Sequence, residues 1–147
     1  MIFAIKEEPN AAEDVRVKTV LAVGCFDIFH YGHLKHLEAS YAMGDRLVVA
    51  VTRDRSVDKG AGRPFYPEKH RKAIIEAIWC VDRVLLVDTS LEALRKVRPD
   101  VFALGQDYYC NVLPEDRAYC KKHGIRIRFT NEQRMSSTEI YDRLTQV

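Results

Sequence analysis

Two histidines and two glycines stand close together in residues 24–33, directly after an apolar run at residues 17–23. Gly24 lets the backbone turn and approach a ligand closely. His30 and His33 are three residues apart, so at the start of a helix they lie on one face. The free amides of a first helical turn and the helix dipole attract anions. The segment is therefore predicted to hold phosphate, with both imidazoles donating hydrogen bonds to its oxygens.

The protonation state of these imidazoles is open from the sequence. A helix N-terminus disfavours the imidazolium form, whereas a bound polyphosphate favours it. Gly32, between the two histidines, has no side chain that would block access to them.

The composition predicts one ordinary soluble domain. The chain has 147 residues, of which 47% are hydrophobic and 30% charged, and its net charge is only +2. This balance argues against nucleic acid as a partner. No apolar run approaches the roughly 20 residues that a membrane span needs, so no membrane partner is expected. The four cysteines form no C-x-x-C pair, and we expect reduced thiols and a cytoplasmic protein.

Apolar runs alternate with helical patterns along the chain. The predicted strands are residues 17–24, 46–52, 83–87, 101–104 and 125–129, and the predicted helices are residues 32–43, 68–80, 91–97, 114–123 and 137–144. Such alternation predicts an α/β domain with a single doubly wound, five-stranded parallel sheet. Ligands bind such sheets at the carboxyl ends of the strands. Polar groups of residues 24–33, 53–67, 105–107 and 134–138 are expected to meet there.

Gly24-Cys25-Phe26-Asp27 followed by His30-Tyr31-Gly32-His33 resembles the G-x-F-D-x-x-H-x-G-H motif of the cytidylyltransferase-like nucleotidyltransferases. Residues 68–72 and 79–84 resemble the E-H-R-K helix and V-D-x-V strand entry of the glycerol-3-phosphate cytidylyltransferases in that family. Residues 134–138 resemble their R-T-x-G-x-S-T segment in a shortened form. The loop at residues 59–64 is closer to the K-G-x-x-R-P of the heptose-phosphate adenylyltransferases.

The resemblance implies a Rossmann-like nucleotidyltransferase fold for residues 17–147, after a polar lead-in at residues 1–16. It also implies transfer of a nucleotidyl group from a nucleoside triphosphate to a small phosphorylated acceptor, with release of pyrophosphate. Mg²⁺ would be the cofactor, bound with the triphosphate, and a homodimer is the expected assembly.

The resemblance further implies roles for individual residues. The catalytic residues would be His30, His33, Lys59 and Arg134. The nucleotide would also be bound by Gly24, Cys25, Phe26, Asp27, Gly32, Asp107, Ser137 and Thr138. Lys59 and Arg71 would bind the acceptor, and Arg63 is an alternative to Lys59 as the loop cation. Asp27 would orient the loop or help to bind magnesium.

Four functions remain open at this point. The E-H-R-K-like helix and Arg134 favour CTP with glycerol 3-phosphate or a related phosphate or phosphonate, and we prefer this interpretation. The loop at residues 59–64 favours ATP with a sugar phosphate. A non-catalytic nucleotide sensor and a zinc site of Asp27, His30 and His33 are the remaining alternatives.

Overall fold

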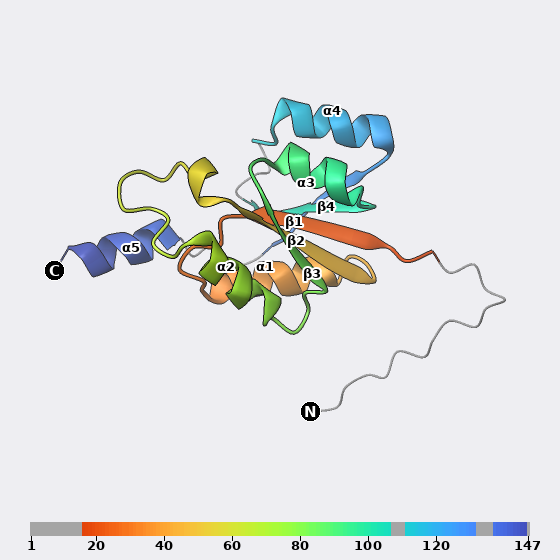
Figure 1. The fold of residues 1–147 in the computed structure, drawn as a ribbon. Coiled ribbons are helices and arrows are strands. Elements are labelled where there is room, and N and C mark those ends of the chain that lie inside the picture. Colours follow the sequence, from red (N-terminus) through yellow and green to blue (C-terminus); the bar gives the residue numbers. More distant parts are fainter. Residues whose placement is uncertain (1–15, 107–110, 132–136, 147) are drawn as a thin grey trace.

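Short apolar runs rich in valine and leucine form a parallel sheet with the strand order β3-β2-β1-β4-β5 (Figure 1). The structure, a computed structural model, describes residues 16–106, 111–131 and 137–146. Its strands are β1 (Thr19–Gly24), β2 (Arg46–Thr52), β3 (Arg83–Val87), β4 (Val101–Leu104) and β5 (Arg126–Phe129). Its helices are α1 (Tyr31–Tyr41), the short 3₁₀ helix η1 (Asp54–Ser56), α2 (Glu68–Glu76), α3 (Ser90–Val97), α4 (Pro114–His123) and α5 (Ser137–Thr145).

Helices cover both faces of the sheet: α1 and α2 lie on one face, and α3 and α4 lie on the other (Figure 1). Successive residues of a strand point to opposite faces. Val20 and Ala22 of β1 accordingly join the core under α1 and α2, while Leu21 joins the core under α3 and α4. The continuous apolar runs are thus explained by burial on both faces, and the predicted doubly wound α/β fold is confirmed.

The element boundaries follow the predictions closely, with one clear difference at α2. This helix ends at Glu76 rather than at the predicted residue 80. The amides of Ile78 and Val81 bond to carbonyls three residues earlier, which tightens the chain into turns before β3. Among the described residues, none of the helices has both the length and the apolar character needed to cross a bilayer.

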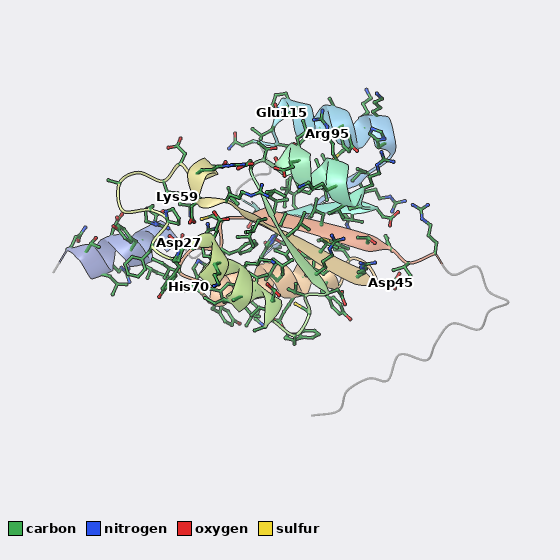
Figure 2. All side chains as sticks on the ribbon, in the orientation of Figure 1. Asp27, Asp45, Lys59, His70, Arg95 and Glu115 are labelled. Atoms are coloured by element: carbon green, nitrogen blue, oxygen red, sulfur yellow. The ribbon has the colours of Figure 1, made fainter. Side chains whose placement is uncertain are left out.

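The parallel strands bring the predicted functional segments to one end of the sheet. Figure 2 shows Asp27 and Lys59 at the end where the strands finish, and Asp45 at the opposite end. Helix α5 also lies at the end where the strands finish (Figure 1). The site is therefore built where the topology of such sheets predicts it.

Candidate active site

The turn between β1 and α1 follows a tight backbone path. Phe26 and Ile28 both adopt left-handed conformations, with φ of 53° and 50°. Such conformations are unfavourable for these residue types, and the surrounding structure has to hold them. A Cβ atom on Gly24 would lie 3.0 Å from the ring of Phe26, so a residue larger than glycine would require that ring to move by a few tenths of an ångström.

The two histidines cap the first turn of α1. Nδ1 of His30 accepts hydrogen bonds from the amides of Gly32 at 3.0 Å and His33 at 3.4 Å. Nδ1 of His33 accepts in return from the amide of His30 at 3.3 Å, which completes a capping box. A ring nitrogen that accepts carries no hydrogen, so each neutral ring carries its hydrogen on Nε2. Helix α1 thereby sets the tautomer of both histidines.

This capping box corrects one expectation from the sequence. The amides of Gly32 and His33 are not free to bind an anion, because they already donate to His30. The donors available to a ligand are instead the Nε2–H groups of the two rings. Nε2 of His30 is buried and has no hydrogen-bond partner among the described residues. A buried donor without a partner calls for an explanation, and a ligand supplies one.

Burial favours the neutral form of both imidazoles. Their rings stack with centroids 3.8 Å apart, and the rings of Phe26 and Phe29 lie 5.4 and 5.5 Å from that of His33. Burial lowers the pKa of His33 to about 3, and the charges of His30 and Lys59 add to this effect. Burial also lowers the pKa of His30, followed by the charge of Lys59. In the protein itself, these shifts favour the neutral form of both rings, and a bound polyphosphate would act in the opposite direction.

Asp27 fixes the loop that follows η1. Its fully buried carboxylate accepts hydrogen bonds from Nε of Arg63 at 2.8 Å and from the amides of Phe65 at 2.7 Å and Tyr66 at 3.0 Å. Burial alone would raise the pKa of Asp27, but these donors outweigh it and keep the pKa below its usual value. Of the two roles considered for Asp27, these contacts support orientation of the loop.

Arg63 is a buried cation with one unused donor. Its side chain is only 2% exposed. Its Nη2 donates to Oγ of Ser137 at 3.2 Å, and its guanidinium carbon lies 4.9 Å from the centre of the Tyr141 ring. Its Nη1 is buried and has no hydrogen-bond partner among the described residues. A guanidinium held in this way suits a phosphate group.

Lys59 meets Arg63 at the first residue of α5. Its Nζ donates to the same Oγ of Ser137, at 3.1 Å. Two cations of one loop thus converge on one hydroxyl, and the charge of Lys59 also lowers the pKa values of His30 and His33. Lys59 and Arg63 were alternatives in the sequence, and the structure brings both to this point. A phosphate would offset the charge that they concentrate.

A cavity of about 280 Å³ lies at the carboxyl ends of the strands. It is open to solvent, and its lining includes Gly24, Cys25, Thr52, Lys59, Asp88, Ser90 and Asp116. The last three are functional candidates that the sequence analysis missed. Asp88 and Ser90 directly follow β3 and therefore stand at the site edge, a signal that the sequence offered. Asp116 lies in α4 and carried no such signal.

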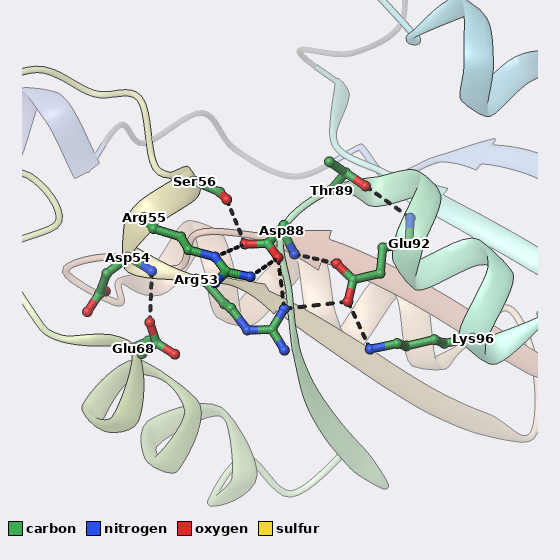
Figure 3. Close-up of polar contacts among 9 residues, drawn as sticks. All are labelled: Arg53, Asp54, Arg55, Ser56, Glu68, Asp88, Thr89, Glu92 and Lys96. Carbon is green, nitrogen blue, oxygen red and sulfur yellow. Dashed lines mark hydrogen bonds and ion pairs between the residues drawn. The ribbon is translucent and has the colours of Figure 1, made fainter.

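Asp88 ties the chain after β2 to the end of β3 (Figure 3). It accepts hydrogen bonds from Nε of Arg55 at 2.8 Å, Oγ of Ser56 at 2.8 Å and Nη1 of Arg53 at 3.2 Å. The hydrogen bonds from Arg55 and Ser56 hold the pKa of Asp88 well below its usual range. This network fixes η1, which leads into the loop of Lys59.

The expectation that Arg71 binds the acceptor phosphate is not supported. Arg71 is fully buried, and it donates to the carbonyl oxygen of Tyr66 at 3.0 Å, that of Cys25 at 2.8 Å and Oδ1 of Asp54 at 2.7 Å. These contacts join α2 to the β1–α1 turn and to η1. The geometry gives Arg71 a structural role, because its guanidinium faces protein groups rather than the cavity.

Two predicted site residues, Asp107 and Arg134, lie outside the described residues, as does most of the lead-in at residues 1–16. Ser137 is buried at the start of α5, and Thr138 beside it is exposed. Among the described residues, no group of three or more His, Cys, Asp or Glu side chains could hold a metal ion together.

Comparison with known proteins identifies the family. The sequence matches the family model described as cytidylyltransferase-like over residues 21–143. The chain belongs to this family. The bifunctional protein HldE of Vibrio vulnificus (strain YJ016) is 38% identical over 95% of this chain and 30% of its own length. HldE of Pseudomonas paraeruginosa (strain DSM 24068 / PA7) is 46% identical over 73% of this chain and 24% of its own length.

A solved structure supports the same assignment. The lipopolysaccharide core biosynthesis protein of Thermoplasma volcanium GSS1 matches 82% of this chain and 100% of its own, with a TM-score of 0.67 and 30% identity. The fold is therefore the Rossmann-like nucleotidyltransferase fold that the resemblance implied. The chain spans less than a third of the length of the HldE relatives, at 30% and 24%.

Proposed function

We propose that this chain transfers AMP from ATP to a sugar phosphate and releases pyrophosphate. A phosphate oxygen of the acceptor attacks the α-phosphorus, and the bond from that phosphorus to the oxygen bridging to the β-phosphate breaks. The products are a nucleoside-diphosphate-linked sugar and pyrophosphate. The attacking oxygen is already anionic, so the step needs no activating base.

One observation carries nucleotidyl transfer: the capping box leaves His30 and His33 as neutral Nε2–H donors beside Lys59. Fixed donors stabilise the negative charge that develops on the α-phosphoryl oxygens during in-line displacement. Lys59 and Nη1 of Arg63 neutralise the charge of the phosphates. The protein therefore acts mainly by positioning and electrostatics.

This proposal of ATP and a sugar phosphate replaces the interpretation preferred from the sequence, which was CTP with glycerol 3-phosphate or a related phosphate or phosphonate. Residues 59–64 resemble the heptose-phosphate adenylyltransferases, and the relatives matched are HldE proteins. The structural neighbour is a lipopolysaccharide core biosynthesis protein, a description that points to a saccharide product. The E-H-R-K-like helix and Arg134 favoured glycerol 3-phosphate and CTP. The hydrogen bonds of Arg71 to Tyr66, Cys25 and Asp54 weaken the part of that support that came from the helix.

Magnesium and a second copy of the chain complete the proposal. Mg²⁺ would enter with ATP and offset part of the triphosphate charge. The homodimer rests on the family resemblance alone, and sedimentation velocity measures it directly.

The test is a screen for pyrophosphate release with ATP and with CTP, each against hexose phosphates and glycerol 3-phosphate. We expect turnover with ATP and at least one sugar phosphate. Turnover with CTP and glycerol 3-phosphate alone would restore the earlier interpretation. Binding of ATP without turnover of any acceptor would favour a non-catalytic sensor.

A further inference from the structure

The carboxylate of Asp116, in α4, lines the cavity next to Ser90, the first residue of α3. Asp116 is only 3% exposed and lines the cavity. Its Oδ2 accepts a hydrogen bond from Oγ of Ser90, which also lines the cavity. Its Oδ1 is buried and has no hydrogen-bond partner among the described residues. Within the described part of the chain, Ser90 therefore holds one oxygen of this carboxylate in place, and the other oxygen has no donor.

Local structure does not account for the burial of Asp116. An acidic residue in a first helical turn usually stays exposed or bonds back to the N-cap amide. The N-cap of α4, Leu113, takes part in no side-chain capping bond. Burial raises the pKa of Asp116, and the hydrogen bond from Ser90 offsets this only in part. Burying an oxygen without a partner is unfavourable, and none of the described residues supplies the donor that Oδ1 would need.

We propose that Oδ1 of Asp116 accepts a hydrogen bond from a hydroxyl group of the acceptor and thereby selects a sugar phosphate among phosphomonoesters. This inference rests on the proposed function. The same cavity reaches Lys59, which would hold the phosphate, so a single molecule can contact both residues. Phe102 and Leu104 give the cavity an apolar wall that suits the C–H face of a sugar ring.

The size of the cavity fits this substrate class. Its volume of about 280 Å³ lies just below the range of roughly 300–1,000 Å³ that is typical of pockets for drug-sized ligands. One sugar ring with its phosphate is the appropriate scale.

A hydroxyl group fits Asp116 better than a quaternary ammonium group does. Recognition of quaternary ammonium groups employs a cage of aromatic rings. Among the described residues that line the cavity, Phe102 is the sole aromatic one. Asp88, the nearby carboxylate after β3, already binds Arg55, Ser56 and Arg53 (Figure 3). Phosphocholine is therefore not the expected acceptor.

Asp116→Asn tests the role of this oxygen with little change of shape. The asparagine oxygen can still accept from Ser90, while its NH₂ group presents a donor where Oδ1 accepted. Glu115→Gln is the matched control, because it removes the neighbouring carboxylate on the exposed side of the same turn. With ATP and the best sugar phosphate from the screen, we expect the acceptor KM of Asp116→Asn to rise about 10- to 100-fold. The KM for ATP should stay within threefold of the wild-type value, and Glu115→Gln should match the wild type.

Deoxy analogues of the same sugar phosphate identify the hydroxyl group and need no variant. The wild type should discriminate against one analogue by about 10-fold or more, and Asp116→Asn should lose that discrimination selectively. A merely structural role for Asp116 would weaken all analogues equally. That result, or an acceptor KM equal to that of Glu115→Gln, would overturn the inference while leaving the proposed function intact.

Direct binding separates the inference from the proposed function. Ligand-observed NMR with the hexose phosphates of the screen reports acceptor binding in the absence of turnover. Binding that Asp116→Asn weakens, without any turnover by the wild type, would contradict the proposed function and support the acceptor site. Turnover of phosphoethanolamine in preference to sugar phosphates, or no binding of any sugar phosphate, would overturn the inference.

Discussion

Replacing His30 with asparagine should separate the structural role of this histidine from its chemical role. The Oδ1 atom of asparagine takes a position close to that of Nδ1 in histidine, and asparagine is among the best N-cap residues. It can therefore accept from the amides of Gly32 and His33, as His30 does at 3.0 and 3.4 Å. It has no group at the position of Nε2, the buried atom without a partner among the described residues.

The expected effects on stability follow from the capping bonds. His30→Asn should change the free energy of unfolding by no more than about 0.5 kcal/mol, whereas His30→Ala loses the cap and should cost about 1 kcal/mol. Urea denaturation at pH 7.5 measures both values. His70→Asn, on an exposed position of α2, is the matched control for the exchange itself.

The expected effects on activity follow from the lost donor. Removal of one donor to a developing oxyanion costs about 10²- to 10³-fold in rate, or about 2.7–4 kcal/mol. Both His30 variants should lose activity by this factor in the pyrophosphate-release assay, although only His30→Ala loses stability. If His30→Asn kept more than a tenth of the wild-type rate, Nε2–H would not be the catalytic donor. If it unfolded as readily as His30→Ala, the capping argument would be wrong.

Three further predictions concern protons, a buried cation and the metal. The pKa of His33 is about 3 when folded and near 6.5 when unfolded, so below pH 6.5 the unfolded chain takes up the proton first. From pH 7.5 to 5.0, the free energy of unfolding should therefore fall by about 2 kcal/mol because of His33. Urea titrations of His33→Asn at both pH values should show a decrease that is smaller by this amount. An equal decrease in the wild type and in His33→Asn would contradict the lowered pKa. Arg71→Met should lower the free energy of unfolding by about 3 kcal/mol, because it leaves buried carbonyls and Asp54 unpaired. The control Lys72→Met, at the neighbouring position, should change it by less than about 1 kcal/mol. An equally small change for Arg71→Met would contradict the structural role of Arg71. EDTA should abolish pyrophosphate release and added Mg²⁺ restore it, while turnover that persists in EDTA would exclude a magnesium–ATP substrate.

The strands and the position of the site could be predicted from the sequence because both depend on local signals. The buried run of β2 is continuous, and the glycine turn before α1 lies between a strand and a helix. The topology of a parallel sheet then places the loops at one end. Even the burial of Arg71 had a signal: it stands four residues before Ile75, on the same face of α2, and both are fully buried.

Other features depend on contacts that spacing cannot reveal. The spacing of two histidines does not reveal which ring nitrogen accepts from the backbone. In the structure Nδ1 accepts, so the Nε2–H groups of the rings, rather than the backbone amides, are left to donate to a ligand. Arg63 and Ser137 are 74 residues apart, and Ser90 and Asp116 are 26 apart. Each pair meets only through the packing of whole elements, α5 on the loop and α4 on α3.

The charges of the chain after β2 separate the residues that hold the fold from those that meet a ligand. Arg53 and Arg55 form ion pairs with Asp88, so a carboxylate of the protein partly balances their charges. Arg63 is paired with Asp27 through Nε, and its Nη1 has no hydrogen-bond partner within the described segments. Lys59 donates only to a neutral hydroxyl among the described contacts, so its charge is not balanced by a carboxylate there.

Neutral imidazoles beside these two cations would have a consequence for the proposed transfer. Interactions that bind substrate and transition state equally lower KM without raising kcat. Two imidazolium rings next to Lys59 and Arg63 would bind ATP and pyrophosphate tightly at every stage of the reaction. Neutral Nε2–H donors contribute most where charge develops on the α-phosphoryl oxygens. In the proposed reaction, the burial that lowers the pKa values of His30 and His33 would therefore direct their interaction toward the transition state rather than toward bound triphosphate or pyrophosphate.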